Sequence, residues 1–381
     1  MGLTSWVANA GSSAIGYVVP FLFVLTIVVF FHELGHFIVA RWCGVKVKTF
    51  SVGFGPELIG FNDRKGTRWR ISAIPLGGYV RFLGDDGEAS APDRAALDAM
   101  PPAERAQTFA AKPVWARAAI VAAGPIANFV LAIVIFTVIF ASFGQQTVAP
   151  RIDGVVADSA AEKAGLKPGD VVVSIDGGAI DSFSDLQRIV SFAAGQPLSI
   201  VVRRGDGNLT VNATPELKDV TDTFGNKQKV GVLGISRSPK PADVVTVRYS
   251  LPAAALMGLR ETWFITDHTV SYLAGVIARR QSADQLGGPI RVAEVSAQVA
   301  TLGIVALINL AGILSVSIGL INLVPIPMLD GGHLLYFAAE AVRGRPLSER
   351  VQDIGFRLGL AAVLMLMIFA TWNDIIHLSS L

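Results

Sequence analysis

Four long apolar segments dominate the pattern of hydrophobic and polar positions along the chain. They cover residues 17–40, 114–143, 299–324 and 358–372. A helix needs about 20 predominantly apolar residues to cross a bilayer, so the first three segments are long enough. The fourth is short, but Arg357 beside it can extend its aliphatic stem toward the membrane surface and lengthen the reach of the segment. The pattern therefore predicts a polytopic α-helical membrane protein with four transmembrane helices.

The composition agrees with this prediction and narrows the class of function. Hydrophobic residues make up 52% of the chain and charged residues 16%, with a mean hydropathy of +0.52. Soluble proteins are about one quarter charged. The net charge of +2 gives no reason to expect a nucleic-acid partner, and Cys43 as the sole cysteine excludes an internal disulfide and a cysteine-based metal site. Residues 1–16 lack Lys and Arg, so we expect the first segment to be a retained span rather than a signal peptide.

The distribution of Lys and Arg around the four segments predicts their orientation. Residues 41–117 carry twelve of these residues and residues 325–357 carry four, whereas residues 1–40 and 373–381 carry none. Positively charged loops stay in the cytoplasm. We therefore expect both termini and the long region 144–298 to lie outside, and the regions 41–113 and 325–357 to lie in the cytoplasm.

Two stretches in the first cytoplasmic region alternate apolar and polar residues as β-strands do. Residues 45–52 and 67–74 follow this pattern, and each is followed by a break rich in glycine and proline. They predict a small antiparallel sheet close to the membrane. Two interpretations stay open: an ordinary surface hairpin, or an edge strand at 45–52 or 67–74 that pairs with an extended substrate, with Lys46, Lys48 and Thr49 as the candidate positions on the first.

A soluble module follows the second apolar segment. The sequence from Ala164 to Gly178 reads AGLKPGDVVVSIDGG and is followed by a helical pattern at 184–192 and two strand patterns. This resembles a single bacterial PDZ domain. The resemblance implies a groove that binds extended peptide ends, formed by a strand with Ile152 and Val155 and a helix with Leu186 and Ile189. The alternative is a spacer without a ligand.

These patterns divide the chain into four parts. The first two spans and the hairpin occupy residues 1–143, and the PDZ domain occupies residues 144–216. Residues 217–298 form an extracytoplasmic linker, in which residues 251–277 mix apolar and charged positions as an amphipathic helix at the membrane interface does. The last two spans lie within residues 299–381.

The first span contains His32-Glu33-Leu34-Gly35-His36, and Glu33 is the only charged residue between residues 17 and 40. Ionisable residues at membrane depth are costly and mark functional sites. Histidines at i and i+4 share one face of a helix and can bind one Zn²⁺, while the glutamate beside them acts as a general base toward water. The alternative is a pair of buried histidines satisfied by neighbouring helices.

A catalytic zinc usually has a third protein ligand. The predicted orientation puts Asp330 and His333, which follow the third span, on the same side of the membrane as His36. Asp330 is favoured because the glycines at 331 and 332 let the backbone turn its carboxylate toward a metal. His333 stays the alternative. Asn128, in the second span, belongs either to a helix-packing motif or to the active site.

Three motifs together resemble those of the site-2 intramembrane zinc metalloproteases: HELGH in the first span, GPIAN in the second and NLVPIPMLDGG in the third. The PDZ-like module, the hairpin with FGP, the QLGGPI sequence and the PLSER sequence narrow the resemblance to the bacterial regulator of sigma-E protease branch. The resemblance implies that Zn²⁺ is bound by His32, His36 and Asp330, that Glu33 is the base, and that Asn322 and Asn128 hold the substrate.

The resemblance also implies a function. We expect hydrolysis of a peptide bond in or beside the transmembrane helix of a single-pass membrane protein, typically an anti-sigma factor already trimmed outside, in envelope stress signalling. The enzyme would lie among the lipids of the bacterial inner membrane, with its PDZ domain in the periplasm. The rival interpretations are a PDZ scaffold with a vestigial metal site and a metal transporter. A transporter needs polar residues through several spans, which the second and fourth spans lack.

Overall fold

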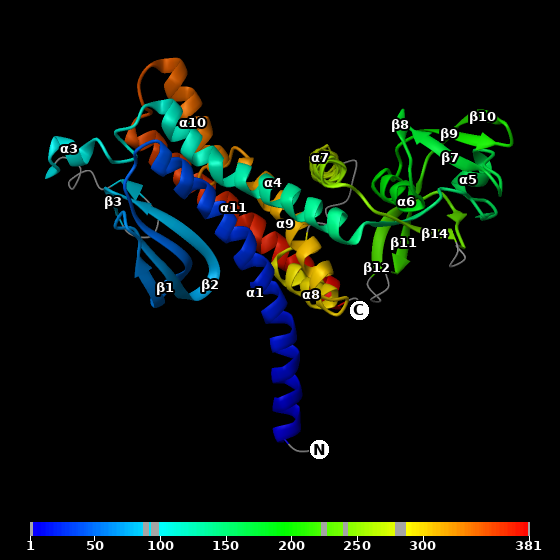
Figure 1. Ribbon diagram of the computed structural model, residues 1–381, viewed down its shortest axis with the longest axis horizontal. Coiled ribbons are helices and arrows are strands. Elements are labelled where there is room, and N and C mark those ends of the chain that lie inside the picture. The colour runs from blue at the N-terminus through cyan, green and yellow to red at the C-terminus, as the bar shows by residue number, and fades with distance from the viewer. Residues whose placement is uncertain are drawn as a thin grey trace. The chain divides into compact units, whose positions relative to one another are not determined.

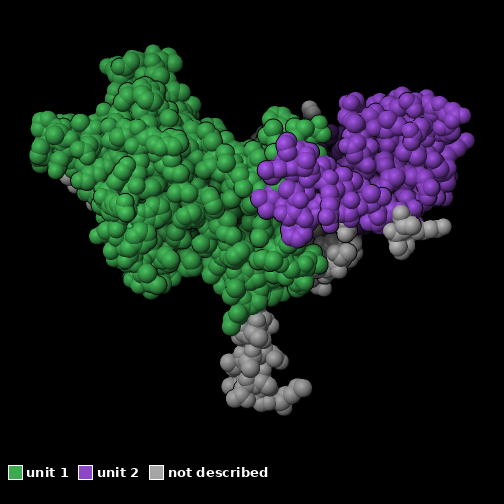
Figure 2. Space-filling view, in the orientation of Figure 1, with its two compact units in different colours: residues 1–137, 255–267, 286–376 green, residues 138–254, 268–285, 377–381 purple. Residues whose placement is uncertain are grey.

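The computed structural model describes residues 3–86, 91–92, 99–221, 227–238, 243–278 and 287–379. The chain divides into two compact units, which Figure 2 distinguishes by colour. The first comprises residues 1–137, 255–267 and 286–376, and the second comprises residues 138–254, 268–285 and 377–381. Apolar helices and a β-hairpin make up most of the first unit, and a β-rich domain makes up most of the second.

Four of the described helices are long and apolar enough to cross a membrane, as the sequence predicts. They are α1 (Leu3–Trp42), α4 (Val114–Phe143), α9 (Ile304–Leu323) and α11 (Glu349–Ser379). The predicted bounds of the second span are confirmed. The fourth span is longer than predicted, because its helix continues through the charged residues at 350–357 instead of beginning after them.

The third span begins at Ile304 rather than at residue 299. A separate helix, α8 (Pro289–Ala300), precedes it, and the two are divided at Gly303, whose φ of +106° few other residues adopt. Helix α8 packs against α1 and α9 (Figure 1). Its first turn is capped by Asp374 of α11, which accepts hydrogen bonds from the backbone N–H groups of Gly288 at 2.8 Å and of Ile290 and Arg291 at 3.1 Å. These N–H groups lack helical partners and compensate the buried carboxylate.

The hairpin is built from two long strands, β1 (Val47–Asn62) and β2 (Arg68–Phe82). Two separate segments of each strand take part in the pairing. Residues 49–52 of β1 pair with residues 68–71 on one side and with residues 78–81 on the other. Residues 57–62 of β1 then pair with the outer side of residues 68–72. The edges of the sheet are therefore residues 57–62 and 78–82, and the segment at 45–52 is interior.

The prediction that Lys46, Lys48 and Thr49 form a free edge is thus wrong. Thr49 is buried and paired on both sides, and the Lys46 backbone donates to the Gln107 carbonyl while accepting from the Leu83 N–H. The alternating pattern finds a strand but not its neighbours, because a doubled-back strand needs partners from distant residues. The far end of the hairpin exposes large apolar side chains, as expected of a sheet that touches lipid: Leu58, Ile59, Phe61, Ile71, Ile74 and Leu76.

The β-rich domain folds around one cluster of buried apolar side chains. Its main sheet has the strand order β10-β9-β7-β8. The strands and helices of this domain are β5 (Gln145–Val148), β6 (Gly154–Val155), α5 (Ala160–Lys163), β7 (Val171–Ile175), β8 (Gly178–Ala179), α6 (Phe183–Phe192), β9 (Leu198–Arg204), β10 (Gly207–Ala213), β11 (Glu216–Thr221), β12 (Lys227–Val232), β13 (Ile235–Ser236) and β14 (Val244–Val247).

The boundary predicted at residue 216 is too early. Leu233 is 1% exposed and belongs to the same buried cluster as the residues of the main sheet. Strand β13 pairs with β6 across 80 positions of sequence, Ile235 opposite Val155. The domain therefore includes the segment after residue 216 that we expected to be linker, because closing the core requires a side chain from beyond the local strand pattern.

The remaining elements complete the connections. Helix α7 spans the stretch in which an amphipathic helix is predicted, and α10 forms in the region after the third span. Their bounds, with those of the short elements near the hairpin, are α7 (Leu251–Ile277), α10 (Asp330–Arg343), β3 (Asp85–Asp86), β4 (Ala91–Pro92) and α3 (Pro102–Arg105).

Candidate metal centre

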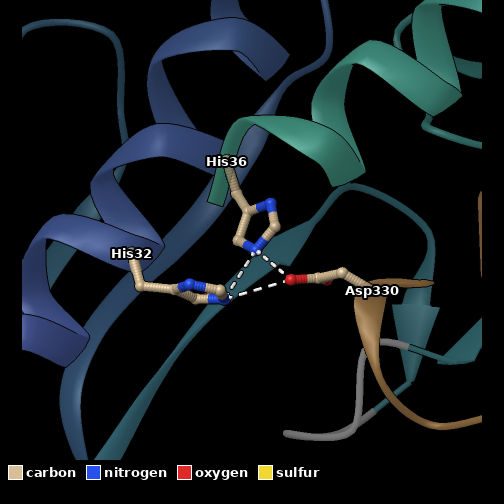
Figure 3. A group of neighbouring side chains, drawn as sticks. All are labelled: His32, His36 and Asp330. Atoms are coloured by element: carbon tan, nitrogen blue, oxygen red, sulfur yellow. Dashed lines mark hydrogen bonds and ion pairs between the residues drawn. The ribbon is translucent and has the colours of Figure 1, made fainter. Parts of the chain in front are cut away.

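His32 and His36 project from one face of α1 toward Asp330 at the start of α10 (Figure 3). The Nε2 atoms of the two histidines are 3.2 Å apart, and Asp330 Oδ2 lies 3.2 Å from His32 Nε2 and 3.6 Å from His36 Nε2. Zinc bonds of about 2.0–2.2 Å in a tetrahedron hold ligand atoms about 3.3–3.6 Å apart. The three atoms thus match one face of a zinc coordination tetrahedron.

The chemistry of these atoms also fits a cation. Asp330 Oδ2 is buried and, apart from its contacts with the two histidine rings, has no hydrogen-bond partner among the described residues. A buried carboxylate oxygen without a partner is costly, and a bound metal ion removes that cost. His32, His36 and Asp330 are a group of described residues whose ligand atoms lie within 4.8 Å of one another, and His333 is not part of it. The geometry therefore favours Asp330 over His333 as the third ligand.

Close packing of α4 on α1 fixes the two histidines. At Gly35 a side chain would collide with the Ala123 carbonyl, and at Gly124 a Cβ would lie 2.9 Å from His32 Cε1 and press on the ring of His36. The glycine inside HELGH and the glycine of GPIAN therefore serve one contact between two helices. The same approach lets His36 Nδ1 donate to the Ile120 carbonyl at 2.8 Å, which leaves Nε2 free to bind a metal.

The turn before α10 brings Asp330 to the histidines. Neither Gly331 nor Gly332 has a positive φ, so the conformational freedom that we expected of them is not used. Their role is space: a Cβ on Gly331 would collide with the Leu323 carbonyl, and one on Gly332 with the Ile326 carbonyl. The first turn of α10 can therefore fold back against the end of α9 and present Asp330 at the metal centre.

An ion pair holds the far half of α10. Arg117, in the first turn of α4, donates to Glu340 Oε1 at 2.6 Å, and its guanidinium lies 5.0 Å from the centre of the Phe337 ring. Both charged side chains are only 15% exposed. Helix α4 thus contacts the histidines through Gly124 and the helix that begins with Asp330 through Arg117, so one helix positions all three ligands.

Glu33 lies between the metal centre and the hairpin. Its side chain is half-buried, and its carboxylate accepts a hydrogen bond from the Val80 backbone in the edge segment 78–82 of β2. A Cβ on Gly78 would lie 3.1 Å from Glu33 Cγ, so the glycine lets this strand pass close to the base. Residues 78–82 are the segment that the sequence pattern missed, since Gly77 and Gly78 read as the end of a strand.

The remaining predicted site residues are scattered. Asn322 lies half-buried in the last turn of α9. Asn128 is fully buried in α4, with its amide 3.2 Å from His32 Nδ1. In the β-rich domain Ile152 and Leu186 are buried in the core and cannot line a groove. Val155 and Ile189 are only partly buried and border that core together with Ile235.

The chain was compared with known families and proteins. The profile of peptidase family M50 matches residues 20–366. A predicted zinc metalloprotease of Agrobacterium fabrum is 50% identical over 360 residues, covering 94% of this chain and 96% of the relative. The metalloprotease MmpA of Caulobacter vibrioides is 42% identical over 380 residues, covering 94% of each. Among solved structures, the PDZ domain of the SdrC-like protein from Listeria monocytogenes aligns with a TM-score of 0.19 at 22% identity, covering 24% of this chain and 87% of that domain.

Proposed function

Since this chain belongs to peptidase family M50 and is a zinc metalloprotease, we propose that it hydrolyses peptide bonds in or beside the transmembrane helix of single-pass membrane proteins. The observation that carries the proposal is the location of the metal centre. His32, Glu33 and His36 lie within the candidate span Ile15–Trp42, so a substrate bond must reach them at membrane depth. The complete ligand set and the base beside it argue against a scaffold with a vestigial site.

The roles of the side chains follow from their chemistry. A zinc ion held by His32, His36 and Asp330 would polarise the scissile carbonyl and make its bound water acidic. Glu33 takes a proton from water and later delivers it to the leaving amine. The hydrogen bond from the Val80 backbone orients the Glu33 carboxylate for this transfer. Asn322, eight positions before Asp330, is our proposed contact for the substrate backbone.

A helical substrate must unwind before its peptide bond can be cleaved, and its freed backbone groups then need partners in an apolar setting. We propose the edge segment 78–82 of β2 as the source of these partners. Side chains and backbone groups alternate along a strand, so the N–H groups of Gly78, Val80 and Phe82 point the same way. The Val80 N–H donates to Glu33 and the Phe82 N–H donates to Asp85 Oδ2 at 3.0 Å, so this direction is away from the sheet, and a substrate carbonyl would compete with these two acceptors.

The β-rich domain is our proposed PDZ domain, with a groove for peptide ends. The support is an apolar border of partly buried side chains that includes Val155, Ile189 and Ile235. Strand β13 pairs with β6, and we propose that the other side of β13 accepts the peptide by strand addition. The substrates would be anti-sigma factors already trimmed outside, in envelope stress signalling. The positions of Lys and Arg support an inner-membrane protein with both termini and this domain outside and the metal centre toward the cytoplasm.

The test is cleavage of a single-pass model substrate by purified full-length protein in detergent. Glu33→Gln removes the base and neither histidine, so zinc content should stay at the wild-type level while the cleavage rate falls by at least about 100-fold. The matched control is Glu261→Gln, in helix α7, which should cleave normally. Normal turnover by the Glu33→Gln protein would overturn the proposal.

A further inference from the structure

The side chain of Asn128 contacts His32, one of the candidate zinc ligands, and the ligand set alone does not explain its position. It is 0% exposed, and its amide lies 3.2 Å from His32 Nδ1. With the amide nitrogen facing the ring, Asn128 Oδ1 is buried without a hydrogen-bond partner among the described residues. That orientation is also wrong for a metal ligand. An N–H that donates to Nδ1 requires the ring proton to sit on Nε2, which is the atom that must bind zinc.

Turning the amide by half a rotation gives Asn128 Oδ1 a hydrogen-bond partner and lets the ring proton sit on His32 Nδ1, as a zinc ligand at Nε2 requires. The two ends of an amide have nearly the same shape, so the hydrogen-bond partner decides which end faces the ring. A zinc-binding imidazole carries its proton on the other nitrogen and needs an acceptor for it. We propose that Asn128 is a positioning residue for zinc: its side-chain oxygen accepts the hydrogen bond of His32 Nδ1–H and so fixes the tautomer and the plane of this ligand.

Comparison of the two histidines supports the assignment. His36 Nδ1 donates to the backbone carbonyl of Ile120, about one helical turn before Gly124, which packs on the rings. In the described part of the chain no backbone carbonyl bonds to His32 Nδ1; the amide of Asn128, two turns beyond Ile120 in the same helix, takes that place. Helix α4 therefore supplies the acceptors for both ligands, one from its backbone and one from a side chain.

The third span holds Asn128 in place. Ser315 Oγ in α9 donates to the Asn128 backbone carbonyl at 2.8 Å, and a Cβ on Gly319 would lie 3.3 Å from Asn128 Cβ. Asn128 is thus clamped between α1 and α9 and is fully buried. A residue in that position orients a ligand more readily than it reaches a substrate, so the inference replaces our expectation that Asn128 holds the substrate. It rests on the metal centre and not on the choice of substrate.

Two nearly isosteric variants of the full-length protein give opposite expectations. Asn128→Leu keeps the volume and removes the acceptor, so its zinc affinity, measured by competition with a chelator, should fall about 10–100-fold. Asn128→Asp keeps an acceptor and cannot donate, so its zinc affinity should stay within a few-fold of wild type. With excess zinc, Asn128→Leu should regain cleavage with an unchanged KM. Asn322→Leu is the matched control and should bind zinc normally.

Three results would overturn the proposal. The first is an Asn128→Leu protein that binds zinc as wild type but shows a raised KM, because that is the behaviour of a substrate contact. The second is loss of zinc from Asn128→Asp, because a carboxylate repels a bare Nδ1 and would show that the amide donates to it. The third is loss of thermal stability by zinc-free Asn128→Leu while its zinc affinity is unchanged, because that marks a packing residue only.

Discussion

The metal centre and the β-hairpin belong to the same compact unit, yet they present chemistry in different ways. The metal centre consists of side chains that two helices hold in fixed positions through glycine contacts and hydrogen bonds to their ring nitrogens. The edge of the hairpin offers backbone N–H groups, which every residue except proline carries. A side-chain site is therefore sensitive to which residue is present, whereas a backbone site is sensitive to where the strand runs.

The difference explains why the residues of the first region can be named from the sequence, whereas the free strand of the second cannot. HExxH and LDGG identify side chains whose atoms can bind a metal, so these motifs can be interpreted without a structure. Residues 45–52 and 67–74 specify only that strands form, and the pairing of residues 49–52 on both sides decides which strand stays free. A backbone site can be assigned only when the neighbours of each strand are known.

Removal of a zinc ligand should have the largest effect. Asp330→Ala should lose zinc and reduce cleavage by more than about 1,000-fold, because the remaining histidines leave the coordination incomplete. Zinc content of the purified protein and cleavage of a model substrate measure this. His333→Ala is the matched control, three residues further along α10, and should keep its zinc. Zinc loss from His333→Ala with retention by Asp330→Ala would reverse the ligand assignment.

A backbone change at the edge of the hairpin should have the next largest effect. Proline removes the outward N–H of residue 80, so Val80→Pro should lower cleavage about tenfold or more while zinc content stays normal. Val80→Ala keeps the N–H and should cleave at near the wild-type rate. Because Val80 also contacts Glu33, Leu76→Pro tests the exposed residues just before this edge, away from the base. If both proline variants cleave normally in folded protein, the edge does not receive the substrate.

The ion pair between α4 and α10 should show an intermediate effect. Glu340→Gln leaves Arg117 with a buried charge and a neutral partner, which should cost about 1–3 kcal/mol of unfolding free energy and weaken zinc binding a few-fold. Thermal unfolding and chelator competition measure these quantities, and the double variant Arg117→Glu with Glu340→Arg should recover part of the loss. Glu216→Gln is the control, because its exposed pair with Lys163 should contribute almost nothing.

The smallest expected effect is acid destabilisation of the β-rich domain. The Ser238 N–H, with Arg237 and Arg151, lowers the pKa of Asp153 to about 2, and the Arg204 guanidinium lowers the pKa of Asp170. In the unfolded chain these carboxyls have a pKa of about 3.9. The ionised groups therefore stabilise the domain above pH 4, and that contribution is lost as the pH falls toward 2.

Hydrogen exchange of the full-length protein measures this effect region by region. Protection of the β-rich domain should decrease between pH 4 and pH 2, after correction for the intrinsic pH dependence of exchange. Asp170→Asn should make the decrease smaller, because the neutral amide does not titrate. An equal acid response in Asp170→Asn and wild type would show that Asp170 does not contribute to this response.

The prediction of the spans shows how far local sequence reaches. The predicted bounds of the second span are confirmed at both ends. They can be predicted because they depend only on residues of the helix itself. The third was placed five residues too early because α8 and α9 are both apolar at their junction, and only the turn at Gly303 separates them. Leu233 entered the core of the β-rich domain from beyond its predicted end for the same reason: closure of a core depends on partners that local patterns do not include.

The amino-acid sequence alone identifies which atoms can bind the metal. Histidines four positions apart share a helix face whatever surrounds them, and the charges beside each span predict that Asp330 lies on the same side of the membrane as His36. Only the tertiary structure decided that Asn128 faces His32, that Arg117 holds α10 through Glu340, and that residues 78–82 rather than 45–52 form the edge beside Glu33. The first kind of statement depends on helix geometry within five residues. The second depends on contacts between residues tens to hundreds of positions apart, and these exist only once the chain has packed.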